Sequence, residues 1–274
     1  MRKARPVGYP TLLALALFMT GTTVEVHGQR EGRDNEYAVN DLRGQHRSYV
    51  MNETDETIPY ALFVPSGYAP AKPAPLMVSL HGAGRQYDWL MNYAGFLDLA
   101  DQHGYVVATP LGYTRRGGYG YRGNSPQDHR AEQDVMNVLR LVSDELNIDE
   151  HRIYLWGHSM GGSGTYYLAS RYPDIWAGLA AVAGGSLTAD YVDAQAIRHI
   201  PFLVIQGTDD QTVPVSRARA PVRKMRELGM QHLYIEIPGG DHSLFISRNP
   251  QVVEHLFSFF NLVVKPHTLH DTQP

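Results

Sequence analysis

The chain has 274 residues, of which 43% are hydrophobic, and it carries a formal net charge of -4 at pH 7. That length and hydrophobic content suffice for one sizeable core, and the negative charge argues against nucleic acid as a partner. The sequence contains no cysteine, which excludes disulfides, thiolate catalysis and cysteine-based metal sites.

The amino-terminal segment has the pattern of a cleavable export signal. Basic residues at positions 2, 3 and 5 precede an apolar run over 12–19, which is too short to span a bilayer. We expect cleavage after Gly28, a secreted or periplasmic protein and no stable membrane insertion of the mature chain; an amino-terminal membrane anchor is the alternative. The expected organisation is a signal peptide over 1–28, a flexible segment over 29–45, one catalytic domain over 46–263 and a flexible tail over 264–274.

Short apolar segments alternate with segments of helical periodicity along the rest of the chain. Strands over 47–51 and 58–64 flank a polar turn, which predicts an antiparallel hairpin at a sheet edge. Further strands are expected over 76–80, 105–110, 153–156, 179–183, 202–206 and 234–237, and helices over 89–102, 131–146, 162–172, 218–228 and 250–260. This alternation predicts an α/β fold with a mostly parallel sheet, an antiparallel amino-terminal edge hairpin and helices on both faces.

The stretch over 153–162, Ile-Tyr-Leu-Trp-Gly-His-Ser-Met-Gly-Gly, changes from an apolar strand to a helix at Ser159. A G-x-S-x-G pattern at such a turn is typical of a nucleophile elbow. Gly157 and Gly161 would let strand and helix pass closely around a strained turn. We therefore predict that Ser159 is a nucleophile and that the helix amides behind it face the place where negative charge develops.

A serine nucleophile needs a base within hydrogen-bond reach and an acid that orients the base. In elbow hydrolases the acid follows the nucleophile in the chain and the histidine comes last. The segment over 207–214, Gly-Thr-Asp-Asp-Gln-Thr-Val-Pro, ends an expected strand and predicts Asp210 as the acid in preference to Asp209. The loop over 239–243 predicts His242 as the base; the other downstream histidines, at positions 232, 255, 267 and 270, lie outside such a loop.

Two backbone amides are expected to bind the oxyanion that forms when the serine attacks. One is the amide of Met160, which follows the nucleophile. The other should come from the loop His81-Gly82-Ala83-Gly84 after a strand, and we assign it to Ala83, with Gly84 as the alternative. His81 is expected to brace this loop rather than to act as a base.

The segment over 112–123 is rich in glycine, tyrosine and arginine and predicts a loop at the end of a strand. Such loops build binding sites in open α/β sheets. The tyrosines Tyr113, Tyr119 and Tyr121 are candidate substrate-binding residues, suited to an aromatic or sugar-linked acyl group. The arginines at 115, 116 and 122 could instead bind a carboxylate or phosphate on the substrate. The alternative is that the segment is a solvated surface loop with no binding role.

The motifs over 80–84, 157–162 and 207–214, together with Asp241-His242, resemble those of secreted α/β-hydrolase esterases. The similar groups are polyhydroxybutyrate-depolymerase-like, feruloyl and acetylxylan esterases, which are related to prolyl-oligopeptidase-like hydrolases. The resemblance covers about residues 47–261. Unlike many depolymerases of this kind, the chain lacks cysteines and a separate substrate-binding domain, and it lacks the propeller domain of the peptide-cutting relatives.

The resemblance implies hydrolysis of a carboxylic ester through an acyl-enzyme, with neither a metal nor an organic cofactor. The implied partner is a small-molecule or polysaccharide-linked ester. A serine peptidase on the same three residues, or a non-catalytic binding protein on the same fold, remains the alternative.

Overall fold

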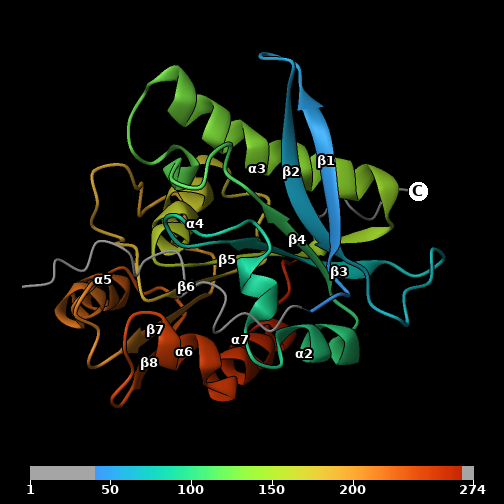
Figure 1. The fold of residues 1–274 in the computed structure, drawn as a ribbon. Coiled ribbons are helices and arrows are strands. Elements are labelled where there is room, and N and C mark those ends of the chain that lie inside the picture. The colour runs from blue at the N-terminus through green and yellow to red at the C-terminus, as the bar shows by residue number, and fades with distance from the viewer. Residues whose placement is uncertain (1–40, 267–274) are drawn as a thin grey trace, which may run out of the picture. The chain divides into compact units, whose positions relative to one another are not determined.

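Eight strands form one sheet in the order β1-β2-β4-β3-β5-β6-β7-β8 (Figure 1). The computed structural model describes residues 41–266, so the expected signal peptide and most of the expected tail lie outside the described residues. The strands are β1 (Gln45–Met51), β2 (Glu56–Phe63), β3 (Ala74–Leu80), β4 (Val106–Pro110), β5 (Ile148–His158), β6 (Gly178–Val182), β7 (Phe202–Gly207) and β8 (His232–Ile237). Over 41–266, none of the helices has the length and apolar character that crossing a membrane requires.

The strand directions follow the expected pattern. β1 and β2 pair antiparallel, with Met51 opposite Glu56 at the tip of the hairpin, and β2 also runs antiparallel to β4. All further neighbours, from β4 to β8, pair in parallel. The predicted mostly parallel sheet with an antiparallel amino-terminal edge hairpin is therefore confirmed.

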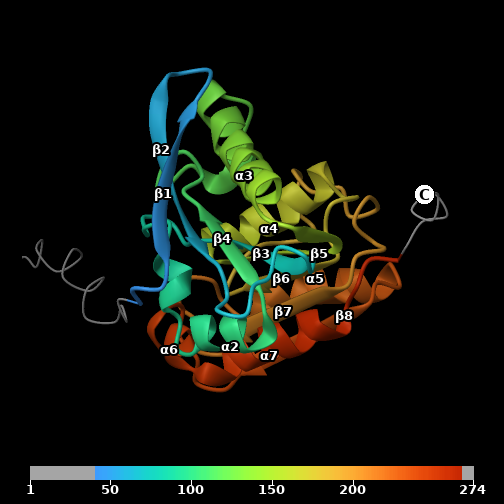
Figure 2. The same ribbon diagram turned by 90° about the vertical axis from the view of Figure 1, so that its right-hand side faces the viewer.

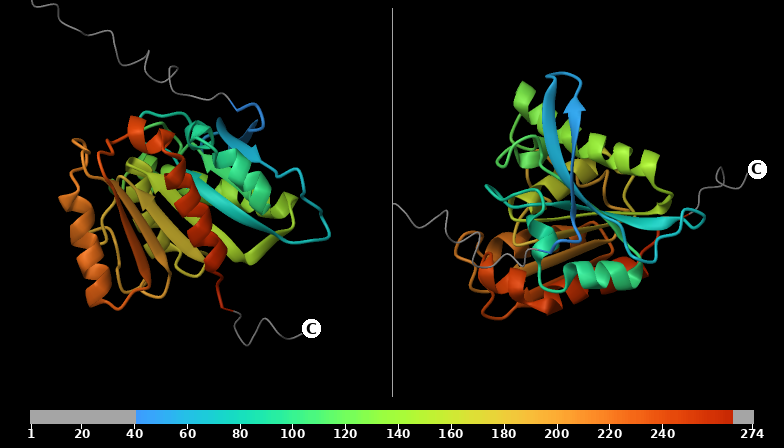
Figure 3. Two further views of the ribbon diagram at one scale, coloured as in Figure 1. Left: turned by 90° about the horizontal axis from the view of Figure 1, so that it is seen from below. Right: turned by 45° about the vertical axis from the view of Figure 1, so that its right-hand side comes forward.

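Helices cover both faces of the sheet (Figures 2 and 3). Buried side chains of α3 (Pro126–Glu145), α4 (Met160–Arg171) and α5 (Ser216–Glu227) join one hydrophobic cluster with the sheet. Those of α2 (Phe96–His103) and α7 (Pro250–Leu262) join a second cluster. Because both faces are covered, all seven residues of β3 are buried, which explains why the central strands are nearly continuous apolar runs.

The helix expected over 89–102 is interrupted in the structure. A short 3₁₀-helix, η1 (Trp89–Asn92), comes first, and Gly95 then separates it from α2 with a φ of 75°. Glycine adopts that left-handed conformation without the steric cost that other residues bear. The chain can therefore turn at Gly95 and start a new helix in another direction.

Two other helices also differ from the expectation. α3 begins at Pro126 rather than near 131, because Ser125 and Asp128 form a capping box in which each side chain accepts from the other residue's amide. The short helix α6 (Leu244–Arg248) was not expected, since five residues are too few to establish a helical period. A second 3₁₀ turn, η2 (Gly118–Gly120), lies within the glycine-rich loop.

Two glycines at the junction of β5 and α4 have no space for a side chain. A Cβ on Gly157 would collide with the backbone of Gly161, and a Cβ on Gly161 would collide with the carbonyl of Leu80. Leu80 is the last residue of β3 and lies opposite Gly157 in the sheet. The β5–α4 turn is therefore pressed against the end of β3, from which the loop after His81 departs.

We predict that Gly161→Ala destabilises the protein by about 3 kcal/mol, because its Cβ meets backbone that cannot rotate away. Helix propensity alone would favour alanine by roughly 1 kcal/mol, so the sign of the change separates the two effects. Gly67→Ala is the matched control, since nothing lies within 4 Å of its added Cβ. Urea unfolding midpoints measure both variants, and equal midpoints would contradict the close packing.

Candidate active site

Ser159 is the single residue between β5 and α4, and its backbone has φ 57° and ψ -112°. A non-glycine residue with positive φ is strained and persists only where its surroundings hold it. Here the amide of Ser159 donates to the carbonyl of Val182 at the end of β6, at 2.9 Å. The residue is only partly buried, so its hydroxyl is accessible at the carboxyl edge of the parallel strands.

A continuous chain of hydrogen bonds joins the three residues selected from the sequence. His242 Nε2 lies 2.9 Å from Ser159 Oγ, and His242 Nδ1 lies 2.8 Å from Asp210 Oδ2. An ionised carboxylate only accepts hydrogen bonds, so the imidazole proton is assigned to Nδ1 and Nε2 accepts from the serine hydroxyl. The side chain of Asp210 is fully buried, whereas 17% of the His242 side chain is exposed. A substrate can thus reach the imidazole but not the carboxylate.

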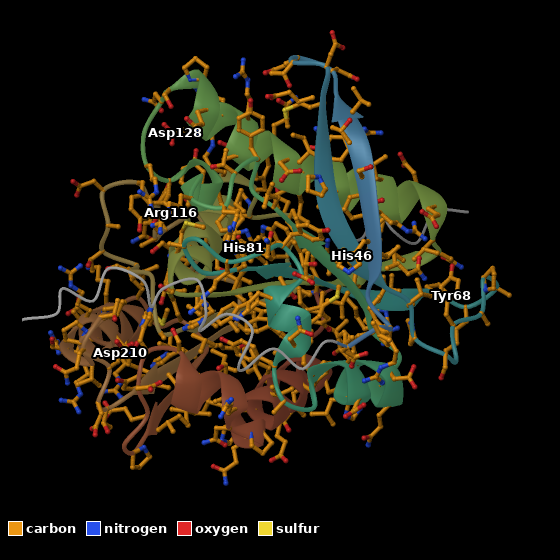
Figure 4. The ribbon with its side chains drawn as sticks, in the orientation of Figure 1. His46, Tyr68, His81, Arg116, Asp128 and Asp210 are labelled. Carbon is orange, nitrogen blue, oxygen red and sulfur yellow. The ribbon has the colours of Figure 1, made fainter. Side chains whose placement is uncertain are left out.

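Asp210 is held by donors on both of its oxygens. Gln206 Nε2 donates to Oδ2 at 2.9 Å, and the amides of Thr212 and Val213 donate to Oδ1 at 2.8 and 2.7 Å. These bonds form because the chain turns back on itself directly after β7, where Figure 4 labels Asp210. Asp209, by contrast, is exposed, and its carboxylate accepts from the neighbouring Thr208 hydroxyl. Only the second of the two aspartates is therefore hydrogen-bonded to the imidazole of His242.

The loop after β3 carries one of the two amides that are expected to bind an oxyanion. Over residues 41–266, the amides of Ala83 and Met160 donate no hydrogen bond. The amide of Gly84, the alternative donor, is bonded to the carbonyl of Arg115 at 2.7 Å. Ala83 rather than Gly84 thus has a free amide, and a Cβ on Gly82 would lie 3.7 Å from Ser159 Cβ, which places this loop beside the elbow.

Tyr119 braces the loop after β3 and is not part of a pocket wall, which corrects the expectation for this residue. Its side chain is fully buried, and its hydroxyl donates to the carbonyl of His81 at 3.1 Å. The ring is accommodated because Gly112 and Gly164 lie against it, where a Cβ would come within 2.6 and 2.7 Å. Two of the glycines on which Tyr119 packs therefore serve to make room for a buried aromatic ring.

His81 and Arg115 add to this brace. The ring nitrogens of His81 each lie 2.8 Å from a carbonyl oxygen, one of Gly82 and one of Leu111. Burial lowers the pKa of His81, so the neutral ring carries one proton and donates to one of the two carbonyls. Arg115 donates from its guanidinium to the carbonyl of Gly84. Because a trans peptide points its C=O and the next N–H in opposite directions, fixing these carbonyls also fixes the amides.

The remaining residues of the glycine-rich loop take separate positions. Tyr121 is half-buried, with its ring 5.1 Å from that of Tyr191. The guanidinium of Arg116, which Figure 4 labels, lies against Gly84, where an added Cβ would come within 3.1 Å of it. Tyr113 points instead toward the hairpin, where its hydroxyl donates to Glu56 at 2.5 Å. The three tyrosines therefore do not share one wall.

His158 was not singled out from the sequence, although it precedes the nucleophile. It is buried, and its Nε2 donates to the backbone carbonyl of His242 at 2.7 Å. Its ring stacks on Trp89, with centroids 5.1 Å apart. Burial, and then the nearby His242, lower the pKa of His158 to about 3, so the ring stays neutral. The only signal in the sequence is that His158 directly precedes Ser159. That position does not show whether the side chain orients another residue or simply packs in the core.

Comparison with known proteins identifies a family. The family model described as PET hydrolase-like matches residues 95–271, more than half of the chain. The chain is 30% identical over 166 residues to a bifunctional acetylxylan esterase/xylanase of Neocallimastix patriciarum, covering 61% of this chain and 23% of that protein. It is 29% identical over 125 residues to feruloyl esterase B of Neurospora crassa, covering 44% and 42%. The chain thus matches less than half the length of these curated relatives.

Solved structures share the fold. A thermostable esterase superposes with a TM-score of 0.65 at 28% identity, covering 81% of this chain and 64% of the other. A CE1 ferulic acid esterase from Anaeromyces mucronatus superposes with a TM-score of 0.62 at 16% identity, covering 84% and 95%. These superpositions support the predicted fold class independently of the sheet topology.

We predict that Tyr119→Phe slows modification of Ser159 by a fluorophosphonate about tenfold, roughly 1.4 kcal/mol. The loss of one hydrogen bond frees the His81 carbonyl and lets the loop amides drift from the position they must hold. Tyr121→Phe is the control, because over residues 41–266 the Tyr121 hydroxyl makes no hydrogen bond to the loop after β3 and its ring lies beside that of Tyr191. An unchanged inactivation rate in Tyr119→Phe would show that the brace is dispensable.

Proposed function

The chain belongs to the PET hydrolase-like family, and we propose that it hydrolyses carboxylic esters with Ser159 as the nucleophile. The observation that carries this proposal is the hydrogen-bonded series Ser159–His242–Asp210 beside the amides of Met160 and Ala83, which donate no hydrogen bond within residues 41–266. Nucleophile, base and orienting acid within hydrogen-bond reach are the minimum for this chemistry. The fold alone would not suffice, because the same fold hosts unrelated functions.

In the first half of the reaction, Ser159 Oγ attacks the ester carbonyl while its proton passes to His242 Nε2. The buried Asp210 carboxylate holds the imidazole by Nδ1 and stabilises the positive charge that the ring acquires. The carbonyl oxygen becomes an oxyanion and accepts from the amides of Met160 and Ala83. Collapse of this intermediate expels the alcohol, which takes the proton from His242, and leaves an acyl-serine.

In the second half, water attacks the acyl-serine. His242 now accepts a proton from the water, and the same two amides stabilise the second oxyanion. The acid leaves when His242 returns the proton to Ser159. The alcohol keeps the proton that Ser159 first gave up, water supplies hydroxyl to the acyl group and a proton to Ser159, and the site returns to its starting state with no external reagent.

The proposed substrates are esters of a short or hydroxycinnamoyl acid, either free or linked to a polysaccharide. Support comes from the named activities of the relatives, which include acetylxylan and feruloyl esterases. We also propose that the chain is exported, on the basis of its amino-terminal residues 1–28, which lie outside the described residues. Amino-terminal sequencing of the protein recovered from the medium or periplasm tests the expected cleavage after Gly28.

We predict that Ser159→Ala lowers hydrolysis of p-nitrophenyl acetate and of a methyl hydroxycinnamate by about 10⁴ or more, because the attacking atom is gone. The circular dichroism spectrum should be unchanged, since one hydroxyl is removed from a partly exposed position. Retention of more than about a thousandth of the activity would contradict the role of Ser159.

The two adjacent aspartates provide a second test. Asp210→Asn should lower kcat by roughly 10⁴, because an amide in that position no longer fixes the imidazole in the required tautomer. Asp209→Asn should change kcat less than about threefold, because its exposed carboxylate accepts only from the neighbouring Thr208 hydroxyl and the substitution keeps its backbone bond to Gly240. A larger loss in Asp209→Asn than in Asp210→Asn would reverse the assignment.

A further inference from the structure

A concave region of about 570 Å³ lies between the edge hairpin and the start of α3. The first residues of β2, the segment after β4 and the first turns of α3 line it, and Figure 1 shows the hairpin tip rising beside α3. None of the three residues in the hydrogen-bonded series lines it. Its size is within the range of pockets that hold small organic ligands.

Tyr113 stands in this region in a strained conformation. Its φ is 64°, although the loop contains glycines that would adopt this conformation freely. The fully buried carboxylate of Asp134 holds the backbone there by accepting from the amides of Gly112 and Tyr113, at 2.6 and 2.9 Å. Strain of this kind persists where surroundings enforce it and is common at ligand-binding sites. Its effect is to direct the phenol ring across the concave region to Glu56.

Arg130 supplies the second, independent observation. Its guanidinium lies over the Tyr113 ring, 5.6 Å from the centroid. Its Nε is buried and, over residues 41–266, donates no hydrogen bond; the nearest carboxylate oxygen, of Glu53, is 3.8 Å away. The guanidinium is therefore only partly satisfied by its protein partners, and its pairing with Glu53 is longer than a hydrogen bond. The side chain is 30% exposed and lines the concave region, so its terminal nitrogens, one of which donates to the Tyr113 hydroxyl at 3.5 Å, can also donate to an oxygen atom of a ligand.

The polar groups around this donor indicate which ligand fits. Arg130 and the Gln127 amide offer donors, the Glu56 carboxylate offers an acceptor, and the hydroxyls of Thr57 and Thr114 can do either. A ligand must therefore present hydroxyl groups that both donate and accept. Glu56 and Glu53 would repel an anion such as phosphate. An acyl chain would leave these charges unsolvated.

The geometry points to a binding site for one sugar unit of a polysaccharide, formed by Tyr113, Arg130, Glu56 and Gln127. The inference rests on the proposed function, in which the ester is carried by such a polymer. β2 lies three strand spacings from β5, roughly 14 Å, and Tyr60 lies opposite Pro110, so residues 56–59 face the same edge of the sheet as Ser159. A polymer chain can span both sites, whereas a small ester cannot.

Binding of unesterified xylan to the full chain carrying Ser159→Ala tests this site without any hydrolysis. We expect affinity electrophoresis through soluble xylan to retard this protein, and Arg130→Gln to weaken the retardation at least about fivefold. Arg140→Gln is the matched control: it lies on the exposed face of α3, where Arg140 pairs with Asp144 at 3.2 Å. Gln127→Ala should weaken binding as well, and since Gln127 is exposed in the first turn, this variant decides the matter if Arg130→Gln fails to fold.

In the active protein, the ratio of kcat/KM for acetylated xylohexaose to that for p-nitrophenyl acetate should fall about fivefold in Gln127→Ala and stay unchanged in Arg140→Gln. Absence of retardation by xylan, equal retardation of Gln127→Ala and the control, or displacement by inorganic phosphate would each overturn the inference. A protein that hydrolyses esters but is not retarded by xylan would contradict the sugar-binding site and not the proposed ester hydrolysis. Conversely, xylan binding by a chain that proves inactive on every ester would refute only the proposed function.

Discussion

The lack of room for a side chain at Gly161 is the constraint on which the rest of the site depends. The backbone of Gly161 lies against that of Leu80, so α4 starts directly beside the end of β3. The turn at Ser159 and the loop after β3 therefore become neighbours. Their amides can then face one oxygen atom from two sides. The side chains hydrogen-bonded in series with Ser159 follow two later strands: Asp210 comes after β7 and His242 after β8. They act on Ser159 only if this junction places the serine correctly.

The glycine-rich loop after β4 connects that junction with the edge hairpin. One end is held by the buried Asp134, and the middle is held by Tyr119, which reaches the carbonyl of His81. Tyr49 of β1 also donates to Asp134, at 2.8 Å. The hairpin, the glycine-rich loop and the loop after β3 are therefore joined by one continuous set of hydrogen bonds between buried polar atoms.

Patterns local in sequence were the ones that could be interpreted before the structure was known. The elbow needs adjacent glycines around one serine, and the positions of Asp210 and His242 follow from chain order and strand ends. The capping box at Ser125 was equally local and could have placed the start of α3. The burial of Tyr119 could not have been found in this way, because it depends on Gly164, which lies 45 residues further along the chain.

The bond from His158 has a consequence for repeated turnover. In the proposed cycle the imidazole of His242 becomes a cation and then neutral again each time an ester is cleaved. The hydrogen bond that holds His242 in place is accepted by its backbone carbonyl, which does not titrate. The donor is His158, whose ring remains uncharged at physiological pH. The general base can therefore change charge while its anchor stays constant, and no second cation opposes the first. A lysine or arginine at the same place would tie the position of the base to its protonation state.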